Sequence, residues 1–273
     1  MIKPKLVLIS NTSNFFKTFT LNHIMELSKK YKLFVCCKNP NKLKKKIPKN
    51  VILKNINFER GVNLFYDLVS FVGIFFFFLK VRPNVSISFT PKVGFMVAVI
   101  SYILSTPCRI HWYTGQIWAN KRGLVKIFFK FLDKIIFTLS SDVLVDSISQ
   151  RKLLIKEQVI SATKSNVFNE GSVGGVNTKR FKPNKQQRIK LRKKLSIKKN
   201  TLVFLYLGRI NRDKGIIELL EAFKIIRKTN DVLLILVGSI EDRKLIYEFK
   251  NQDKILYFNY TNKPEEWFLL SDI

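Results

Sequence analysis

Short apolar runs alternate with longer stretches of helical periodicity along nearly the whole 273-residue chain. In its first part the apolar runs predict six strands, at 5–10, 32–37, 51–56, 85–89, 108–114 and 142–147. The stretches between them predict helices at 14–30, from about 62 to 80, up to about 104, and at 123–139. Strands separated by helices in this way form a parallel sheet that is covered on both faces, so the predicted class is α/β.

The alternation pauses in a segment rich in Gly, Asn, Ser and charge, and then restarts. We therefore expect an N-terminal Rossmann-like domain over 1–165, an interdomain segment over 166–184 and a second Rossmann-like domain over 185–273. The second domain has about three parallel strands, at 201–208, 232–238 and 254–260, and Asp272-Ile273 resembles the first step of a fourth. We expect this domain to be incomplete, through natural truncation, a broken reading frame or artificial shortening.

The chain is strongly basic, with a formal net charge of +30. Residues 1–180 hold 29 Lys and Arg against 8 Asp and Glu, or +21. Codon bias toward Lys is one explanation, and an anionic partner, such as acidic lipid headgroups or a phosphorylated substrate, is the other. No nucleic-acid recognition motif accompanies the dispersed cations, so we expect no nucleic-acid partner. Three cysteines without paired spacing favour a reducing compartment.

Two apolar stretches, 68–79 and 93–104, fall short of the roughly 20 residues that span a bilayer. We expect both to form buried or surface-seated helices.

The stretch "LYLGRINRDKG" (205–215) places three cations between two glycines, just after a predicted strand and before a predicted helix. Parallel sheets bind ligands at this edge, and the amino end of a helix favours anions. Gly208 would let the backbone turn, while Arg209 and Lys214 would grip a diphosphate from two sides. From spacing alone, a solvated basic turn is an equally good interpretation.

Longer segments carry a resemblance to a known family. "YLGRINRDKGIIELLEAF" followed by "LLILVG" resembles the donor-binding signature of family 4 glycosyltransferases. "SFTPKVG", "RIHWYTGQIWA" and "NEGSVGGVNTKRF" resemble the subgroup that builds bacterial surface polysaccharides and lipid-linked oligosaccharides. The resemblance implies the GT-B architecture, in which two Rossmann-like domains face a cleft.

The resemblance also implies an activity. Such an enzyme transfers a hexosyl or N-acetylhexosaminyl group, with retention, from a nucleotide-sugar, here a UDP-sugar, to a lipid-linked or glycan acceptor. It implies no cofactor and no metal. With the basic charge, it implies a cytoplasmic protein at the inner face of the plasma membrane, in peripheral contact with anionic lipid.

Several residues match positions of the family's motifs. Gly208, Arg209 and Lys214 match the donor-diphosphate site. Gln116 stands where the family commonly has a histidine, and a glutamine can bond a sugar hydroxyl but cannot act as acid or base. His111 lies five residues earlier and is as readily a core or cleft-edge residue as a catalytic one.

The acceptor or cleft side would be formed by Lys92, Glu170, Gly171 and Ser172. Lys92 is otherwise one surface lysine among many. The aromatic residues Trp112, Tyr113 and Trp118 could stack on sugar rings, although a core position is commoner. His23 is expected to be structural or on the surface.

One family feature is absent. A Glu-x7-Glu stretch that holds the donor sugar and ribose would follow Ile273. Loss of this orientation raises the barrier, so we expect weak activity or none. The alternatives are an inactive remnant that folds and associates with membrane or partners, and a nucleotide-sugar epimerase of the same architecture.

Overall fold

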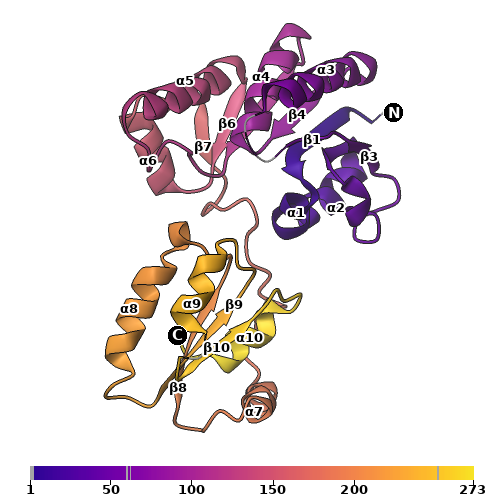
Figure 1. Cartoon of the computed structure of the whole chain (residues 1–273). Coiled ribbons are helices and arrows are strands. Elements are labelled where there is room, and N and C mark those ends of the chain that lie inside the picture. Colours follow the sequence, from indigo (N-terminus) through magenta and orange to yellow (C-terminus); the bar gives the residue numbers. More distant parts are fainter. Residues whose placement is uncertain (1–2, 60, 62, 251) are drawn as a thin grey trace. The chain divides into compact units, whose positions relative to one another are not determined.

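The computed structural model describes residues 3–59, 61, 63–250 and 252–273, and Val62, the expected start of one helix, lies outside them (Figure 1). The chain divides into two compact units, Met1–Gly175 and Val176–Ile273. This boundary lies inside the segment 166–184 that the sequence analysis assigned to the interdomain connection.

A parallel sheet in the order β3-β2-β1-β4-β5-β6-β7 forms the centre of unit 1 within the described residues. Its strands are β1 (Lys5–Thr12), β2 (Lys32–Lys38), β3 (Ile52–Asn55), β4 (Val85–Ser88), β5 (Cys108–Tyr113), β6 (Asp142–Val145) and β7 (Ser165–Val167). Six were predicted. The seventh, β7, was wrongly assigned to irregular structure, because its three residues show no apolar run and form a strand only by pairing with β6.

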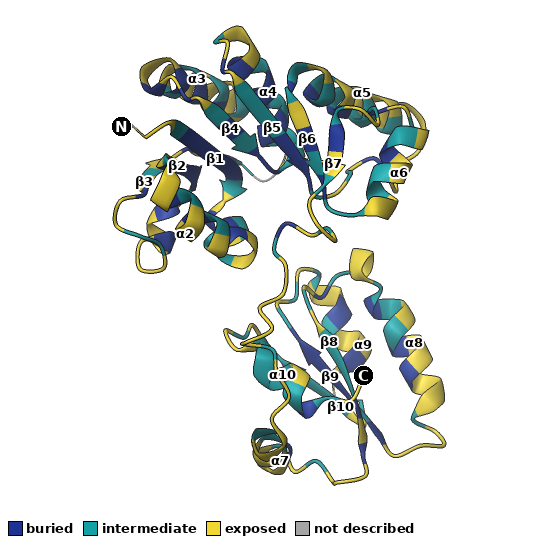
Figure 2. Ribbon diagram, turned by 180° about the vertical axis from the view of Figure 1, so that it is seen from behind, coloured by how far each residue is buried: buried dark blue, intermediate teal, exposed yellow. Residues whose placement is uncertain are grey.

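Helices cover both faces of this sheet (Figures 1 and 2). One layer contains α3 (Leu64–Val81), α4 (Pro91–Ile103), α5 (Gly123–Leu139) and α6 (Ile148–Lys156). The other contains α1 (Ser13–Phe15), α2 (Leu21–Lys30) and the 3₁₀ turn η2 (Pro40–Leu43). Alternate residues of each strand supply the two cores: Val7 and Ile9 pack under α3 and α4, whereas Leu6 and Leu8 pack toward α2.

The first helical stretch is not the continuous helix over 14–30 that its periodicity predicts. A π-helical turn, η1 (Phe16–Thr20), separates α1 from α2. The turn carries an extra residue, which changes the angle between the side chains before and after it. Phe16 and Ile24 are both fully buried in the same core as a result.

Buried aromatic residues hold the Asp133 carboxyl group on the buried face of α5. The Trp118 indole donates to Asp133 Oδ2 at 2.7 Å, and the Tyr113 hydroxyl donates to the Asp133 backbone carbonyl at 2.7 Å. Burial raises the pKa of Asp133 from 3.8 to about 6, although the Trp118 hydrogen bond opposes this shift. Trp112, Tyr113 and Trp118 are all buried, so they are core residues and not sugar-stacking platforms.

The raised pKa predicts a pH-dependent cost of burying Asp133. The folded state keeps the proton up to about pH 6 while the unfolded state loses it near 3.8, so this group destabilises the fold progressively as pH rises through that window. In Asp133→Asn the cost is removed. Chemical denaturation from pH 4 to 7 should show the free energy of unfolding of the wild type falling, relative to the variant, by on the order of 3 kcal/mol. A pH-independent difference would contradict this.

Unit 2 contains a smaller parallel sheet in the order β10-β9-β8. Its strands are β8 (Leu202–Leu207), β9 (Val232–Val237) and β10 (Ile255–Phe258). On one face lie α8 (Ile216–Ile226), α9 (Ile246–Phe249) and the 3₁₀ turns η3 (Arg212–Lys214) and η4 (Arg243–Leu245). On the other face lie α7 (Lys185–Lys194) and α10 (Pro264–Leu270). Both units are therefore layered α/β structures.

The last residues pair along β8, as expected for the first step of a further strand. Asp272 N donates to Val203 O at 2.8 Å, and Leu205 N donates to Ile273 O at 2.8 Å. The Asp272 carboxylate accepts from Val203 N and forms ion pairs with Arg188 and Arg192 of α7. These bonds fasten α7 and this segment to one edge of the sheet.

Candidate functional site

The loops that follow β8 and β9 leave the sheet together. The two strands pair in parallel as far as Leu207 and Val237. The pairing continues into the loops, because Gly208 N donates to Val237 O at 3.0 Å and Ile210 N donates to Ser239 O at 2.9 Å. The predicted basic turn is consequently held against the β9 loop at the carboxyl edge of the sheet, where parallel sheets bind ligands.

The glycine that this close approach requires is Gly238. It has φ +154°, and a Cβ added there would lie 1.7 Å from the Gly208 carbonyl oxygen. Gly208 has no left-handed φ, and a Cβ on it would meet nothing nearer than 3.7 Å. The expectation that Gly208 itself permits the turn is therefore wrong. The residue that must be glycine is Gly238, which follows the neighbouring strand β9.

The two glycines form a matched pair for substitution. Gly238→Ala should destabilise unit 2 by about 3 kcal/mol or more, because the methyl group overlaps backbone that cannot move without breaking the strand pairing. Gly208→Ala should change stability by less than about 1 kcal/mol. Urea unfolding of the two variants measures the contrast, and equal losses would refute the assignment.

Arg209 lies at the start of the basic turn, with its backbone carbonyl held by the Tyr206 hydroxyl at 2.7 Å. Its side chain is about half exposed (52%). The guanidinium Nη1 donates to both carboxylate oxygens of Glu241, at 3.1 and 3.0 Å, and the Asn211 amide donates to the same carboxylate at 2.9 Å. Burial raises the pKa of Tyr206, with Arg209 acting in the opposite direction.

The other cations of the turn differ in their surroundings. Arg212 faces Asp242, with Nε 3.5 Å from Oδ2. Lys214 is exposed at the end of η3, and within the described residues no carboxylate lies in ion-pair distance of its ammonium. Gly215 (φ +72°) then precedes the first turn of α8. Lys214 is available to an incoming anion, whereas an anion that binds Arg209 competes with Glu241.

Glu241 and Asp242 were not predicted to belong to the site. Both lie just beyond a predicted strand, in the loop paired with the basic turn through the Ile210–Ile240 bridge. Parallel strands end at one edge of a sheet, so the adjacency of these two loops could have been inferred from strand order.

In unit 1, Asp146 organises the carboxyl edge of the sheet. It directly follows β6, and its Oδ1 accepts from Val173 N at 2.8 Å and from the Trp112 indole at 3.1 Å. Burial raises its pKa, and these two hydrogen bonds partly offset that shift. One carboxylate thus ties the loop 168–175 to β5 and β6.

Further contacts hold the same loop. Ser172 N donates to Asp146 O at 2.6 Å. Gly171 has φ +100°, and a Cβ on it would lie 2.3 Å from that oxygen, so no other residue fits without movement. The His23 Nε2 is 2.7 Å from Val173 O, which gives His23 the structural role that was expected. Glu170 is exposed at the tip of the loop.

Gln116 lies in the loop after β5. The backbone N–H of Asp146 determines the orientation of the Gln116 side-chain amide through Gln150. Asp146 N donates to Gln150 Oε1 at 3.0 Å, so Gln150 Nε2 donates to Gln116 Oε1 at 3.1 Å. Among the residues that the structure describes, the buried Gln116 Nε2 has no hydrogen-bond partner. An unpaired buried donor is costly, so this amide group would gain from a hydrogen-bond acceptor brought close to it.

His111 is a core residue. It is 1% exposed beneath α4, its Nδ1 is 2.8 Å from Ser88 Oγ, and its ring fills the space beside Gly94. Burial lowers its pKa to about 3, so the imidazole is neutral. Of the two interpretations left open for His111, the structure supports the core position and not the catalytic one, because the imidazole is packed under a helix away from solvent.

Lys92 lies at the first turn of α4, as expected, but its ammonium already has three acceptors. It donates to Glu59 O at 3.1 Å and Gly61 O at 2.5 Å, and it forms an ion pair with Asp67. An acceptor phosphate at Lys92 would have to displace these groups, so the structure favours a role for Lys92 in holding α3 to α4.

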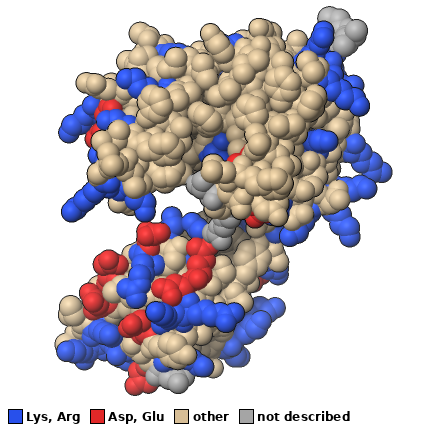
Figure 3. Space-filling view, turned by 45° about the horizontal axis from the view of Figure 1, so that its top comes forward, with Lys and Arg blue, Asp and Glu red and all other residues tan. Residues whose placement is uncertain are grey.

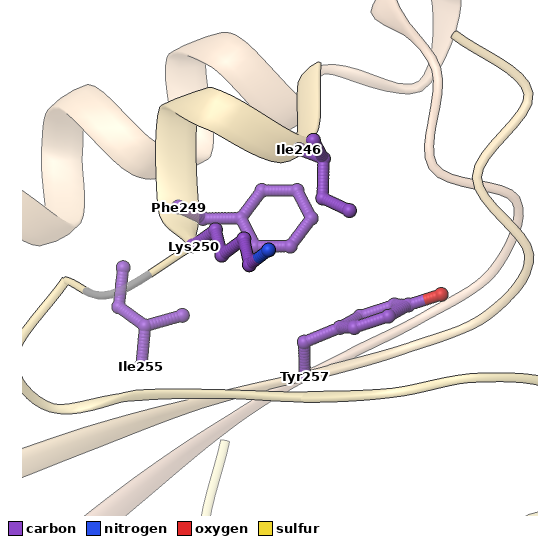
Figure 4. A pocket seen from close by; sticks show the side chains of 5 residues that line it. All are labelled: Ile246, Phe249, Lys250, Ile255 and Tyr257. Atoms are coloured by element: carbon purple, nitrogen blue, oxygen red, sulfur yellow. The ribbon is translucent and has the colours of Figure 1, made fainter. Parts of the chain in front are cut away.

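A small hollow in unit 2 lies between α9 and the strand β10 (Figure 4). Its lining comprises Ile246, Phe249, Lys250, Ile255 and Tyr257. The lining is mostly apolar, and the Tyr257 hydroxyl donates to Gly238 O at 3.1 Å. One lysine with apolar neighbours does not provide the convergent donors that a diphosphate requires.

Comparison with known proteins places the basic turn in a recognised domain. Residues 187–273 match the family described as Glycosyl transferases group 1. The chain is 31% identical over 201 residues to the capsular polysaccharide biosynthesis glycosyltransferase CapM of Staphylococcus aureus, covering 73% of this chain and 52% of CapM. It is 24% identical over 223 residues to an Escherichia coli UDP-Gal:alpha-D-GlcNAc-diphosphoundecaprenol alpha-1,3-galactosyltransferase, covering 78% of this chain and 57% of that enzyme. The chain thus spans about half the length of the curated relatives it matches.

Solved structures establish the architecture. HepE of Anabaena, in complex with UDP and glucose, aligns with a TM-score of 0.72 at 14% identity, over 98% of this chain and 73% of HepE. The fold is GT-B. A UDP-N-acetylglucosamine 2-epimerase from Rickettsia bellii also aligns, with a TM-score of 0.61 at 16% identity, over 96% of this chain and 70% of the epimerase. At these identities the likeness establishes the fold and not the reaction.

Proposed function

We propose that this chain is a retaining glycosyltransferase of family 4 that uses a UDP-sugar. It transfers a hexosyl or N-acetylhexosaminyl group to a lipid-linked or glycan acceptor in the synthesis of a surface polysaccharide, such as a capsule or lipopolysaccharide. The names of the two curated relatives and the UDP in HepE support this proposal. The reaction needs no metal or other cofactor in this proposal, because protein cations meet the leaving group.

The observation that carries the proposal is the basic turn at the carboxyl edge of unit 2. Arg209 and Lys214 project from a strand-to-helix turn inside the segment that matches the glycosyltransferase domain. As the sugar–phosphate bond breaks, negative charge grows on the departing UDP. An Arg fork and a Lys ammonium stabilise that charge where other enzymes use a metal ion.

Unit 1 supplies the acceptor side in this proposal. The Gln116 Nε2, which has no partner among the described residues, donates to a hydroxyl of the reacting sugar or the acceptor. The loop 168–175 presents Glu170 and the backbone of Gly171 and Ser172 beside it, held by Asp146. A lipid-linked acceptor fits a protein that acts at the cytoplasmic face of the plasma membrane in peripheral contact with anionic lipid.

The donor site is tested by a double substitution. Arg209→Ala with Lys214→Ala removes two charge-assisted contacts, each worth about 1.5 to 3 kcal/mol, so UDP affinity in calorimetric titration should fall about a hundredfold or more. Arg243→Ala with Lys244→Ala, on the exposed turn η4 of the same unit, is the matched control and should bind as the wild type does. Unchanged affinity in the first variant would refute the proposed site.

A second substitution tests the competition at Arg209. Glu241→Gln removes the carboxylate that occupies the guanidinium and repels an incoming diphosphate. UDP should bind several-fold more tightly, a modest gain because Arg209 is half exposed and its ion pair is weak in water. Glu248→Gln on α9 is the control. Weaker binding by Glu241→Gln would show that Glu241 positions Arg209 for the ligand.

Transfer itself is measured with radiolabelled UDP-sugars and a bacterial membrane extract. Label that moves into lipid-linked or polymeric product supports the proposal. UDP binding without transfer supports the inactive alternative, and release of free or epimerised sugar supports the epimerase alternative. The double variant should abolish transfer.

A further inference from the structure

Two helices of unit 1 present apolar side chains to solvent. On α3 the exposed residues include Leu64, Phe65, Leu68, Val69, Phe76 and Leu79. On α5 they include Leu124, Val125, Ile127, Phe128 and Phe131. Both helices pack against α4, which lies between them on one face of the sheet (Figure 1). We name these eleven residues the α3/α5 apolar surface. Soluble monomers rarely expose a contiguous patch of this kind without a partner.

The α3 helix forms part of the domain. It has 18 residues and is longer than the apolar stretch 68–79 suggested. With a mean hydropathy of 2.0, it is long and apolar enough to cross a membrane. However, its other face buries Ile74 and Phe78 in the core, and Ser70 donates to Asn57 O at 2.9 Å. A helix that crossed a bilayer would abandon these contacts, so α3 presents only its outer face to a partner.

The charge around this surface identifies the partner. Residues 64–139 hold nine Lys and Arg against two acidic residues, and two of these lysines, Lys126 and Lys130 of α5, pair with Glu157 of α6. The two acidic residues are already engaged, since Asp67 pairs with Lys92 and Asp133 is buried against Trp118. In Figure 3 a broad uncharged area covers much of the visible face of unit 1, with Lys and Arg gathered around its margin. Apolar and aromatic side chains bordered by cations match an anionic lipid interface.

We propose that the α3/α5 apolar surface seats unit 1 on an anionic bilayer, with its Phe and Leu side chains among the acyl chains and its cations at the phosphates. This inference rests on the proposed function, which includes a lipid-linked acceptor, and it names the surface that would bind the membrane. A second copy of the chain fits less well, because it would bring two cationic margins together.

The surface also lies beside the candidate acceptor loops. Each helix begins after a loop that leaves the carboxyl end of a strand, so Leu64 and Leu124 lie toward the same edge of the sheet as Gln116 and Asp146. A bilayer at this position would keep the lipid tail of an acceptor in the membrane while its headgroup reaches that edge.

The test is flotation of the full chain with vesicles of phosphatidylcholine alone or of phosphatidylcholine mixed equally with phosphatidylglycerol. The wild type should bind the mixed vesicles at least tenfold more tightly. Leu68→Gln with Phe76→Gln, Phe128→Gln and Phe131→Gln should weaken this binding about tenfold or more. Lys121→Gln with Arg122→Gln should weaken it and reduce its salt dependence. The control is Ile225→Gln with Tyr247→Gln, two exposed apolar residues of unit 2.

The outcomes separate this inference from the proposed function. UDP affinity and cooperative thermal unfolding should be the same in all these variants. Equal binding to both vesicle types, no binding, or full binding by the four-residue variant would overturn the proposal. A lipid-free dimer in sedimentation that the four-residue variant abolishes would assign the surface to a second copy instead. Resistance to alkaline carbonate extraction would overturn the proposal by showing that the protein is inserted into the bilayer and not bound at its surface.

Discussion

The parallel pairing of β8 with β9 is the constraint on which the candidate donor site depends. It brings the carboxyl ends of both strands to one edge and continues into their loops as far as Ile210 and Ile240. The contact is so close that Gly238 lies against the Gly208 carbonyl with no room for a side chain. The backbone pairing therefore brings Arg209 and Glu241 together, and the guanidinium Nη1 lies 3.0 to 3.1 Å from the two carboxylate oxygens.

The same geometry organises unit 1 through a different group. Asp146 accepts hydrogen bonds from the Val173 amide and the Trp112 indole, while its own amide donates to Gln150. The Asp146 carboxylate, at the end of one strand, thus fixes a loop some thirty residues later in the chain, and the Asp146 backbone N–H orients the Gln116 amide through Gln150. Hydrogen bonds to charged groups are among the stronger polar contacts in proteins, so they hold this Gly- and Asn-rich loop to the edge of the sheet.

Sequence patterns predicted most of the fold because the sheets are parallel and buried. Such strands read as continuous apolar runs, and six of unit 1 and three of unit 2 were found in this way. The strand β7 was missed because only its pairing with β6 makes it a strand. The π-helical turn at Phe16–Thr20 was missed because residue type scarcely distinguishes it from an α-helix. His111 could have been catalytic by position along the chain, and only its burial under α4 excludes this.

The sequence by itself determined the α/β class, the two-part organisation and the cations of the basic turn, since these depend on residue type and local periodicity. Only the tertiary structure decided which groups those cations meet, which glycine the turn requires, which polar atoms remain unpaired and which apolar helix faces remain uncovered. These properties arise from contacts between residues far apart in the chain. A sequence pattern records the type of each residue, but the contacts between distant residues form only when the chain folds into the sheet.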